Sequence, residues 1–556
     1  MRFFSLQVSD ARLYKNRAQL QQNKGEETVR GDIYIQNREG ELFLVATTKS
    51  FLRIYAVPSK IPSDKDREIA QKIVSLLKIP EDGIIQKLSQ KSDTYEVLGE
   101  RIPIEDEKKL KESLASYLSE GVVIERYRDR FYPYNELASH VIGFLGFNEG
   151  ERRGVYGIEQ FYEKELSGGA DIVLTLDLTL QQRTRDFLTK LMDKWKSPAG
   201  SVIIMRPQDG VILAMASKPD FDPNSYNETK DFEYFLNPAV QKVFEPGSIM
   251  KPITIAGGIE IEKVSPATTY EDKGFVEKSG HTIRNAGNRV FGKRTVREVL
   301  AFSINTGAVF VEDLMGNDNF LRTLENFGFG QATGIDLPGE LVGDITNLDK
   351  GRPINYATAS FGQGIATTPL QVINALAAIA YEGKLMRPHV AQFIFYPDGE
   401  KKEIKAQERR RAISPKTASQ MVSMMINAVQ EGYSKKAGVP GYLVAGKTGT
   451  AQIPGSKGEY LDQTIHSVVG FAPAFDRHSS CSLNLMNQLV RLLRLKASPR
   501  SFQNLHSSFY NTIMFFPKLP KKNDNKGKIV EVLIGEDLTW PYFPFIIQKD
   551  NHEELF

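Results

Sequence analysis

The sequence is poor in the residues that build disulfide frameworks and metal centres. Its 556 residues include one cysteine, Cys481, and seven scattered histidines with no paired metal-ligand spacing. A single cysteine permits neither an intramolecular disulfide nor a cysteine-rich metal site. We therefore expect a protein that uses no metal and no other cofactor.

The sequence also lacks an excess of one charge and a long apolar run. Its 71 basic and 68 acidic residues give a net charge of +3, which leaves no electrostatic footprint for nucleic acid. No run of about 18 apolar residues is present that could span a membrane. The N-terminus, MRFFSLQVSDARLYKNRAQLQ, starts apolar and passes at once into a polar helical pattern. We interpret it as the end of a membrane segment whose beginning is missing; the alternative is a short apolar N-terminus.

The character of the chain changes near residue 170. Residues 28–57 alternate apolar and polar positions as strands do, whereas residues 62–78 and 106–119 are charged and amphipathic as helices are. This first section carries no cluster of nucleophile, base and oxyanion donor, so we expect it to have a structural or interaction role. After it, a strand, a long helical pattern to Trp195 and a hairpin around the turn PQDG begin a second domain.

A serine and a lysine lie three residues apart in the stretch EPGSIMKP, as Ser248 and Lys251. At this spacing two helical side chains share one face, which is the geometry that a buried amine needs to deprotonate a hydroxyl. Spacing alone proves little. Ser75 and Lys78 repeat it in an amphipathic segment, where we expect only a solvated lysine beside a helical serine.

Two more short motifs follow in the second domain. Ser303 and Asn305 stand in the helical segment LAFSINTGAVF, but a Ser-x-Asn pattern occurs by chance in most chains of this length. The third motif follows an apolar strand pattern and comprises Lys447, Thr448, Gly449 and Thr450. Its positive charge, hydroxyls and glycine suit an extended peptide that ends in a carboxylate. A solvated hairpin end is the alternative.

The order Ser-x-x-Lys, Ser-x-Asn, Lys-Thr-Gly is specific where its parts are not. With it the chain resembles the penicillin-binding transpeptidases, and more closely their class B members, the monofunctional enzymes of septal or elongation wall synthesis. The resemblance covers roughly Thr28 to Pro473 and includes the blocks HVIGFLG, GVYGIEQFYEKELSG, SKPDFDPN, TGIDLPGE and FGQGIATTPLQ. The chain departs from the best-known second motif at Ile304, where aspartate is usual, which bears on substrate detail.

The resemblance implies a mixed α/β (α+β) architecture. Residues 1–170 are expected to form an elongated pedestal or dimerisation domain. Residues 171–475 are expected to form a β-lactamase-like transpeptidase domain, in which an antiparallel sheet lies between helical layers. Ser248 is expected at the N-terminus of a buried helix, where the dipole favours a developing anion.

The resemblance also implies a reaction. Ser248 would attack a D-alanyl-D-alanine stem peptide and form an acyl-enzyme, and β-lactams would acylate the same serine. Lys251 would be the base, because burial and the charge of Lys447 lower its pKa. Ser303 would relay the proton to the departing amine, and Asn305 would hold the substrate amide and orient the lysine.

The third motif would bind the substrate. Lys447 and Thr448 would hold the terminal carboxylate, and Gly449 would let the peptide backbone come close. The backbone N–H groups of Ser248 and Thr450 would stabilise the oxyanion.

Two alternatives to a cross-linking transpeptidase remain on the same fold. One is a hydrolase, a D,D-carboxypeptidase or β-lactamase, in which water replaces the acceptor amine. No carboxylate that would activate such a water can be assigned by motif between Asn305 and Lys447. The other is a non-catalytic scaffold or β-lactam sensor. By resemblance alone, we expect a membrane-embedded glycan polymerase as partner and an extracytoplasmic catalytic domain on one N-terminal membrane anchor.

The resemblance is expected to stop near Arg477, which makes residues 476–556 an aberrant tail. Codons for His478 to Asn487, read two bases later, permit Phe-Val-Val-Leu-Val-Lys-Leu-Asp-Glu-Pro, and those for Phe509 to Phe516 permit Leu-Gln-Tyr-Tyr-Asn-Val-Leu-Pro. Both peptides look like the missing family segments. We therefore predict a frameshift near Asp476 that removes a strand and leaves an unpaired sheet edge; a divergent natural tail is the alternative.

Overall fold

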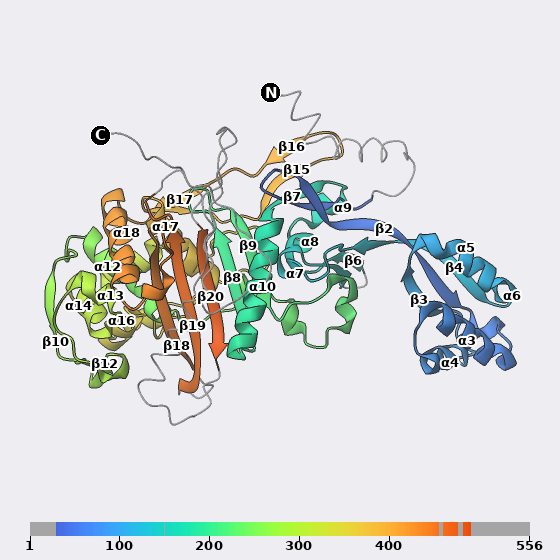
Figure 1. The fold of residues 1–556 in the computed structure, drawn as a ribbon, viewed down its shortest axis with the longest axis horizontal. Coiled ribbons are helices and arrows are strands. Elements are labelled where there is room, and N and C mark those ends of the chain that lie inside the picture. Colours follow the sequence, from blue (N-terminus) through green and yellow to red (C-terminus); the bar gives the residue numbers. More distant parts are fainter. Residues whose placement is uncertain (1–28, 149–150, 455–459, 476–481, 491–556) are drawn as a thin grey trace, which may run out of the picture.

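The molecule is elongated, with a narrow N-terminal lobe at one end and a broad sheet-based body at the other (Figure 1). The computed structural model describes residues 29–148, 151–454, 460–475 and 482–490. Among these residues, no helix combines the length and the apolar character needed to cross a bilayer. The expected remnant of a membrane anchor falls in residues 1–28, outside the described residues.

The N-terminal lobe is organised around strand β2 (Leu42–Ala56), which runs from the body into the lobe (Figure 1). β2 pairs antiparallel with β3 (Glu96–Ile102) and β4 (Val122–Phe131). The lobe has its own core, because Leu52 and Ile54 pack on the apolar face of the neighbouring helices. Its helices are α3 (Asp66–Leu77), α4 (Glu81–Leu88), α5 (Glu107–Ser113) and α6 (Ala115–Leu118).

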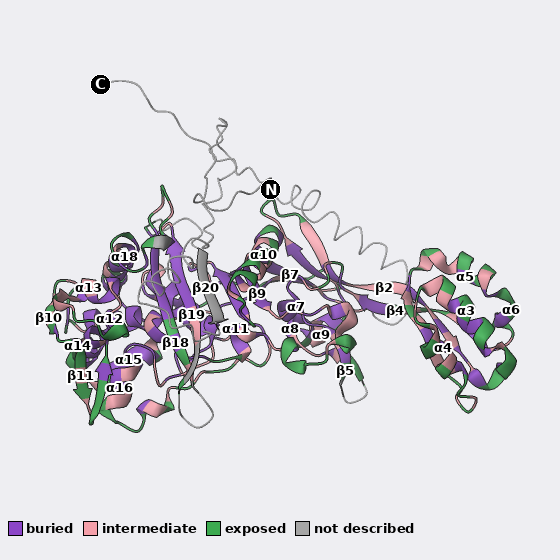
Figure 2. Ribbon diagram, turned by 60° about the horizontal axis from the view of Figure 1, so that its bottom comes forward, coloured by how far each residue is buried: buried purple, intermediate pink, exposed green. Residues whose placement is uncertain are grey.

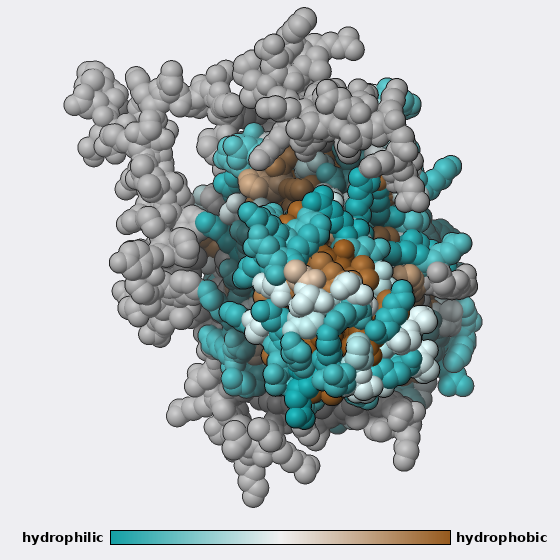
Figure 3. All heavy atoms as spheres, turned by 90° about the vertical axis from the view of Figure 1, so that its right-hand side faces the viewer, coloured by the Kyte–Doolittle hydropathy of each residue, from teal (hydrophilic) through white to brown (hydrophobic). Residues whose placement is uncertain are grey.

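Patterning predicted several elements of this lobe, but not β3, β4 or α4. The strands expected within residues 28–57 and the helices expected within 62–78 and 106–119 are confirmed. Figure 3, which looks onto this end of the molecule, shows a mostly hydrophilic surface with a small hydrophobic area near its centre.

A mixed sheet joins the lobe to the body. Its strands run in the order β16-β15-β7-β1-β2-β3, in which β16 is Lys401–Glu403, and β4 also pairs with β2. β1 (Ile33–Gln36) pairs parallel with β7 (Asp171–Asp177), and β15 (Ala391–Phe395) pairs antiparallel with β7. The predicted boundary at residue 170 lies directly before β7, so it falls within a sheet to which both parts of the chain contribute.

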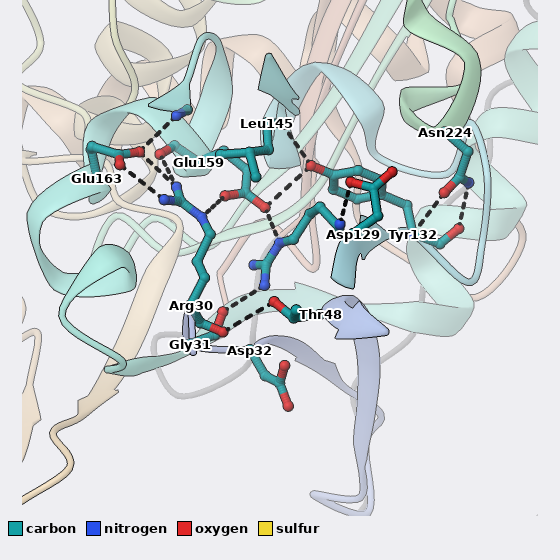
Figure 4. Close-up of polar contacts among 12 residues, drawn as sticks. Arg30, Gly31, Asp32, Thr48, Asp129, Tyr132, Leu145, Glu159, Glu163 and Asn224 are labelled. Carbon is teal, nitrogen blue, oxygen red and sulfur yellow. Dashed lines mark hydrogen bonds and ion pairs between the residues drawn. The ribbon is translucent and has the colours of Figure 1, made fainter. Parts of the chain in front are cut away.

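A buried ion-pair network lies beside this sheet (Figure 4). The Glu159 carboxylate accepts hydrogen bonds from Arg30 Nε at 2.7 Å and from Arg130 Nε at 2.6 Å. Glu163 binds the same Arg30 guanidinium at 2.7 and 2.9 Å. Burial raises the pKa of Glu159, but the two arginines outweigh this effect and hold the pKa below its ordinary value. The two arginines therefore favour the ionised form of this buried carboxylate.

The body is built on a five-stranded antiparallel sheet in the order β18-β19-β20-β8-β9 (Figure 1). Successive side chains of its strands point to opposite faces. Val202 accordingly packs with Leu188 of α10 (Leu178–Trp195), whereas its neighbour Ile203 lies in the main core with Leu376 of α17 (Pro369–Ala380). The predicted antiparallel sheet between helical layers is confirmed. Its strands are β8 (Gly200–Met205), β9 (Ile212–Lys218), β18 (Ala445–Pro454), β19 (Tyr460–Ala472) and β20 (Ser482–Val490).

Strand β20 corrects one prediction about the tail. The chain was expected to lack a strand here, but Ser482–Val490 pairs with both β19 and β8. The pairing uses backbone N–H and C=O groups, which every residue except proline supplies. The sequence also alternates polar and apolar residues from Ser482 to Leu485, as a strand does. The rest of the tail, residues 476–481 and 491–556, lies outside the described residues.

Helices and short strands fill the space beside β18 and complete the body (Figure 2). Helix α12 (Lys251–Glu260) is buried over almost its whole length and packs against α14 (Asn305–Met315) and α18 (Pro415–Gln430). A segment with four short strands, residues 269–295 (the excursion), precedes α13 (Val296–Ala301). These strands are β10 (Thr269–Asp272), β11 (Phe275–Lys278), β12 (His281–Arg284) and β13 (Gly292–Thr295).

Candidate active site

Ser248 lies in a short helical turn, Gly247–Met250, that runs directly into the buried helix α12. The turn is packed tightly against β18. Gly247 has φ +58°, and a Cβ there would lie 2.8 Å from the Thr450 carbonyl oxygen. Only glycine accepts both conditions, so the Pro-Gly pair sets the backbone that presents the serine.

Lys251 faces this serine from the first turn of α12. Its Nζ atom lies 3.0 Å from Ser248 Oγ, 2.8 Å from Asn305 Oδ1, and 2.6 and 3.2 Å from Ser303 O and Oγ. The side chain is completely buried. Burial, and then the nearby Lys447, hold the pKa of Lys251 well below its ordinary value. The surroundings of this amine therefore favour its neutral form.

Ser303 connects the two lysines. It stands between α13 and α14 with φ +55°, a left-handed conformation that is unfavourable for a serine. The conformation directs both its carbonyl and its hydroxyl toward the site, because Lys251 contacts each of them. Lys447 Nζ donates to the same hydroxyl at 2.9 Å.

The third motif occupies strand β18 at the edge of the sheet. Lys447 is buried, and this burial lowers its pKa to about 7. A Cβ on Gly449 would lie 2.5 Å from Ser467 Oγ and 3.0 Å from the Pro246 carbonyl oxygen, so glycine permits the strand to touch the turn that carries Ser248. Thr448 is buried and Thr450 is exposed.

The structure thus brings together all three motifs that the sequence singled out. The pair Ser75 and Lys78, which has the same spacing as Ser248 and Lys251, lies outside this site. Ser75 donates to the Lys72 carbonyl at 2.7 Å, and Lys78 is exposed at the end of α3.

Sequence reasoning missed Glu245, although it lies inside the first quoted stretch. Its carboxylate accepts from Gly364 N at 2.8 Å and lies 3.2 Å from the Tyr460 hydroxyl at the start of β19. Burial raises the pKa of Glu245 above its ordinary value. Its proximity to the serine was the available signal, but its partners lie more than 100 residues away.

A second missed group supports the Ser-x-Asn motif from the excursion before it. Asp272 is buried and accepts from Thr306 Oγ1 at 2.6 Å and from Asn285 Nδ2 at 3.0 and 3.1 Å. Asn285 Oδ1 in turn accepts from Thr306 N at 3.1 Å. No local pattern marks these residues, because the contacts exist only after folding.

No three His, Cys, Asp or Glu side chains within the described ranges gather as a metal centre would require. The side chains that contact one another at the centre of the site are two serines, two lysines and an amide.

Comparisons with known proteins match most of the chain. A family model, the penicillin-binding protein transpeptidase domain, matches residues 200–505, and another, the penicillin-binding protein dimerisation domain, matches residues 26–175. The first match extends beyond residue 477, where the sequence analysis expected the resemblance to end.

Individual relatives agree with these matches. Stage V sporulation protein D of Bacillus subtilis is 32% identical over 78% of this chain and 71% of its own length. The probable peptidoglycan D,D-transpeptidase PenA of Neisseria meningitidis is 28% identical over 79% of this chain and 77% of its own. The crystal structure of penicillin-binding protein 3 from Mycobacterium tuberculosis, complexed with ampicillin, is 28% identical, covers 69% of this chain and 89% of that one, and has a TM-score of 0.62.

Proposed function

The chain belongs to the class B penicillin-binding protein transpeptidases, and from this premise we propose that it cross-links peptidoglycan stem peptides through an acyl-enzyme on Ser248. The observation that carries the proposal is the 3.0 Å contact between Ser248 Oγ and the buried amine of Lys251. The name of the Neisseria relative, a D,D-transpeptidase, supports the reaction class.

Acylation follows from the geometry around Lys251. A neutral amine has two hydrogens and one lone pair. The hydrogens fit the two shortest contacts, to Ser303 O and Asn305 Oδ1, which leaves the lone pair for the Ser248 proton. Ser248 Oγ then attacks the carbonyl carbon of the penultimate D-alanine as its proton passes to the amine.

The leaving group departs with a proton from the same network. Ser303 Oγ contacts both lysines, so it can pass the proton from Lys251 to the nitrogen of the terminal D-alanine as the C–N bond breaks. The acyl ester on Ser248 remains. A penicillin would acylate Ser248 in the same way, but its leaving nitrogen stays tethered to the ligand.

Charge is stabilised from β18 and from the turn that carries Ser248. The N–H groups of Ser248 and Thr450 would hold the oxyanion, with roughly 3 to 4 kcal/mol per donor. The close approach of Gly247 to the Thr450 carbonyl supports this assignment, since it brings the two backbones side by side. Lys447, Thr448 and Gly449 would receive the terminal carboxylate at the sheet edge.

The second half-reaction distinguishes a transpeptidase from a hydrolase. An amine from a neighbouring wall peptide attacks the ester carbon, its proton returns to Ser248 Oγ through Lys251, and a new amide forms. We further propose that the N-terminal lobe carries an extracytoplasmic body on a membrane anchor and meets a membrane-embedded glycan polymerase. Family membership supports this placement.

Covalent labelling tests the proposal. A fluorescent penicillin should add one acyl group, and peptide mapping should place it on Ser248. Ser248→Ala should abolish the label while leaving the melting temperature close to that of the parent. An adduct on another residue, or a label retained by Ser248→Ala, would contradict the assignment.

A further inference from the structure

Two exposed arginines without a carboxylate partner flank the Ser-x-Asn motif. Arg284 ends β12, and Arg289 follows five residues later, before β13. Two other cations of this excursion are paired, Lys278 with Asp313 and Arg294 with Glu298, whereas Lys273 and Lys293 have no ion pair among the described residues. Within the described part of the chain, no ion pair engages Arg284 or Arg289.

Aromatic rings hold these two guanidinium groups without neutralising them. Arg284 lies over the ring of Phe275, its direct cross-strand neighbour, at 5.6 Å from the centroid. Arg289 lies over the ring of Tyr433 at 5.4 Å and donates to its hydroxyl. Both rings are themselves about two-fifths exposed, at 43% and 41%. A cation stacked in this way keeps its N–H edge for another acceptor.

Hydrogen bonds of the buried Asp272 and Asn285 hold the segments that carry the two arginines. Asp272 accepts from the N–H groups of Gly274 at 3.0 Å and Phe291 at 2.7 Å, in addition to Asn285 and Thr306. Asn285 also donates to the Arg289 carbonyl at 3.1 Å. The oxygens of this buried acid are therefore taken by neutral donors, and the arginines are carried by a loop that is held at both ends.

The same loop touches the reaction centre. Asn305 Nδ2 donates to the Arg284 carbonyl at 3.1 Å, while its Oδ1 contacts Lys251. On the other side, Tyr433 packs edge-on against Phe302, the residue before Ser303, at 5.7 Å. Arg284 is thus linked to Asn305 through its backbone and Arg289 to Phe302 through Tyr433, so both arginines adjoin the Ser-x-Asn motif.

We propose that Arg284 and Arg289 form a carboxylate-binding rim for an acidic wall peptide. The rim would hold a carboxylate other than the terminal one, because Lys447, which is proposed to bind the terminal carboxylate, is buried, whereas both arginines are exposed. A guanidinium matches a carboxylate with two parallel hydrogen bonds, which a solvent-facing site needs for selectivity. This inference rests on the proposed function and names a feature of its substrate.

Matched synthetic peptides test the rim. Each ends in D-Ala-D-Ala and carries at one internal position either a free carboxylate or the carboxamide. The wild-type protein should prefer the carboxylate peptide in kcat/KM for D-alanine release. Arg284→Ala and Arg289→Ala should each reduce that preference about tenfold. A second arm offers the same pair as acceptor amines, so that it separates a rim for the donor from a rim for the acceptor.

Controls keep the outcome decisive. The rate of benzylpenicillin acylation should stay within about twofold in both variants, which shows an intact fold and reaction centre. Arg289→Lys should keep only part of the preference, since it keeps the charge without the planar fork. Arg322→Ala, an exposed arginine on α15 (Asn317–Asn326), should have no effect.

Three results overturn the rim. They are a wild type indifferent to the carboxylate in both arms, equal losses on both peptides, and an equal effect of Arg322→Ala. A wild type that neither reacts with penicillin nor releases D-alanine would instead remove the proposed function on which the rim depends.

Discussion

Lys251 is a lysine whose side chain is completely buried. Burying a lysine normally destabilises the folded state. Here a second buried lysine, Lys447, contacts the same hydroxyl group, that of Ser303. That arrangement lowers the pKa of Lys251 and so favours its neutral amine, which the proposed mechanism requires as the base for Ser248. Under that mechanism, the burial that destabilises the lysine also produces the base.

Removing the base is the most direct test at this scale. Lys251→Ala should reduce the rate of penicillin acylation by roughly 10² to 10⁴, because an unactivated hydroxyl remains. Stopped-flow quenching or a gel time course measures the rate. Lys78→Ala, in the pair with the same spacing, should leave it unchanged. Acylation at the parental rate in Lys251→Ala would refute the role of this lysine.

The two lysines also predict a bell-shaped pH profile. As pH falls through the lowered pKa of Lys251, protonation removes the base and acylation slows. As pH rises through about 7, Lys447 loses its proton and its hold on a carboxylate. The alkaline limb should therefore appear with a carboxylate-bearing peptide and vanish with a carboxylate-free ester, and Lys447→Ala should remove the difference. Identical alkaline limbs for both substrates would remove Lys447 from the binding role.

At the scale of single elements, the periodicity of the sequence predicted helices and strands that depend on neighbouring residues in the chain. The pattern ending at Trp195 became α10, and the turn PQDG became the hairpin of β8 and β9. What patterning could not identify are contacts between distant segments. The network around Asp272 joins three places in the chain, and the partners of Glu245 come from two other elements, so no local rule marks them.

Strand β20 shows a different limit. The strand was expected to be missing because the residues of the tail differ from those of the family. A strand is held in a sheet by its backbone hydrogen bonds, however, and these do not depend on those residues. The three motifs themselves could be predicted because their order is informative, but the distances between their side chains could not.

The packing of β18 on the turn that carries Ser248 gives the prediction at this scale. Gly449→Ala would place a methyl group against Ser467 and the Pro246 carbonyl, and the strand must shift away. Penicillin acylation should fall by at least about tenfold, with a loss of roughly 1 to 3 kcal/mol in stability. The control is Gly83→Ala in α4, where a methyl group meets nothing within 4 Å and should be neutral or stabilising. Equal behaviour of the two variants would contradict the tight contact.

At the scale of the whole molecule, the buried ion network is expected to hold the lobe to the body. Glu159→Ala would leave Arg130, which is 1% exposed, as a buried charge without its carboxylate. We expect a loss of about 3 to 5 kcal/mol, seen as faster hydrogen exchange in β1 and β4. The double variant Arg130→Met/Glu159→Leu should lose less, because both charges leave together. Unchanged exchange in Glu159→Ala would show that the network does not fix the junction.

The tail carries a prediction of its own at this scale. If a frameshift near Asp476 produced residues 477–556, the second reading frame should encode the expected strand and the Tyr-Tyr segment. A chain restored to that frame should melt at a higher temperature than the chain as written, since the restored tail would regain the strand and the final helix expected from the family. A stop codon before the Tyr-Tyr segment, or neither peptide in that frame, would disprove the frameshift.

The central claim is that the acyl group on Ser248 is passed to an amine. The deciding measurement is the product ratio when a D-Ala-D-Ala peptide is turned over with increasing amounts of an acceptor peptide, resolved by mass spectrometry. The account predicts that the cross-linked dimer grows with acceptor concentration at the expense of the hydrolysed peptide, and that Ser248→Ala forms neither. Hydrolysed peptide alone at every acceptor concentration would make the protein a carboxypeptidase, and the claim would be wrong.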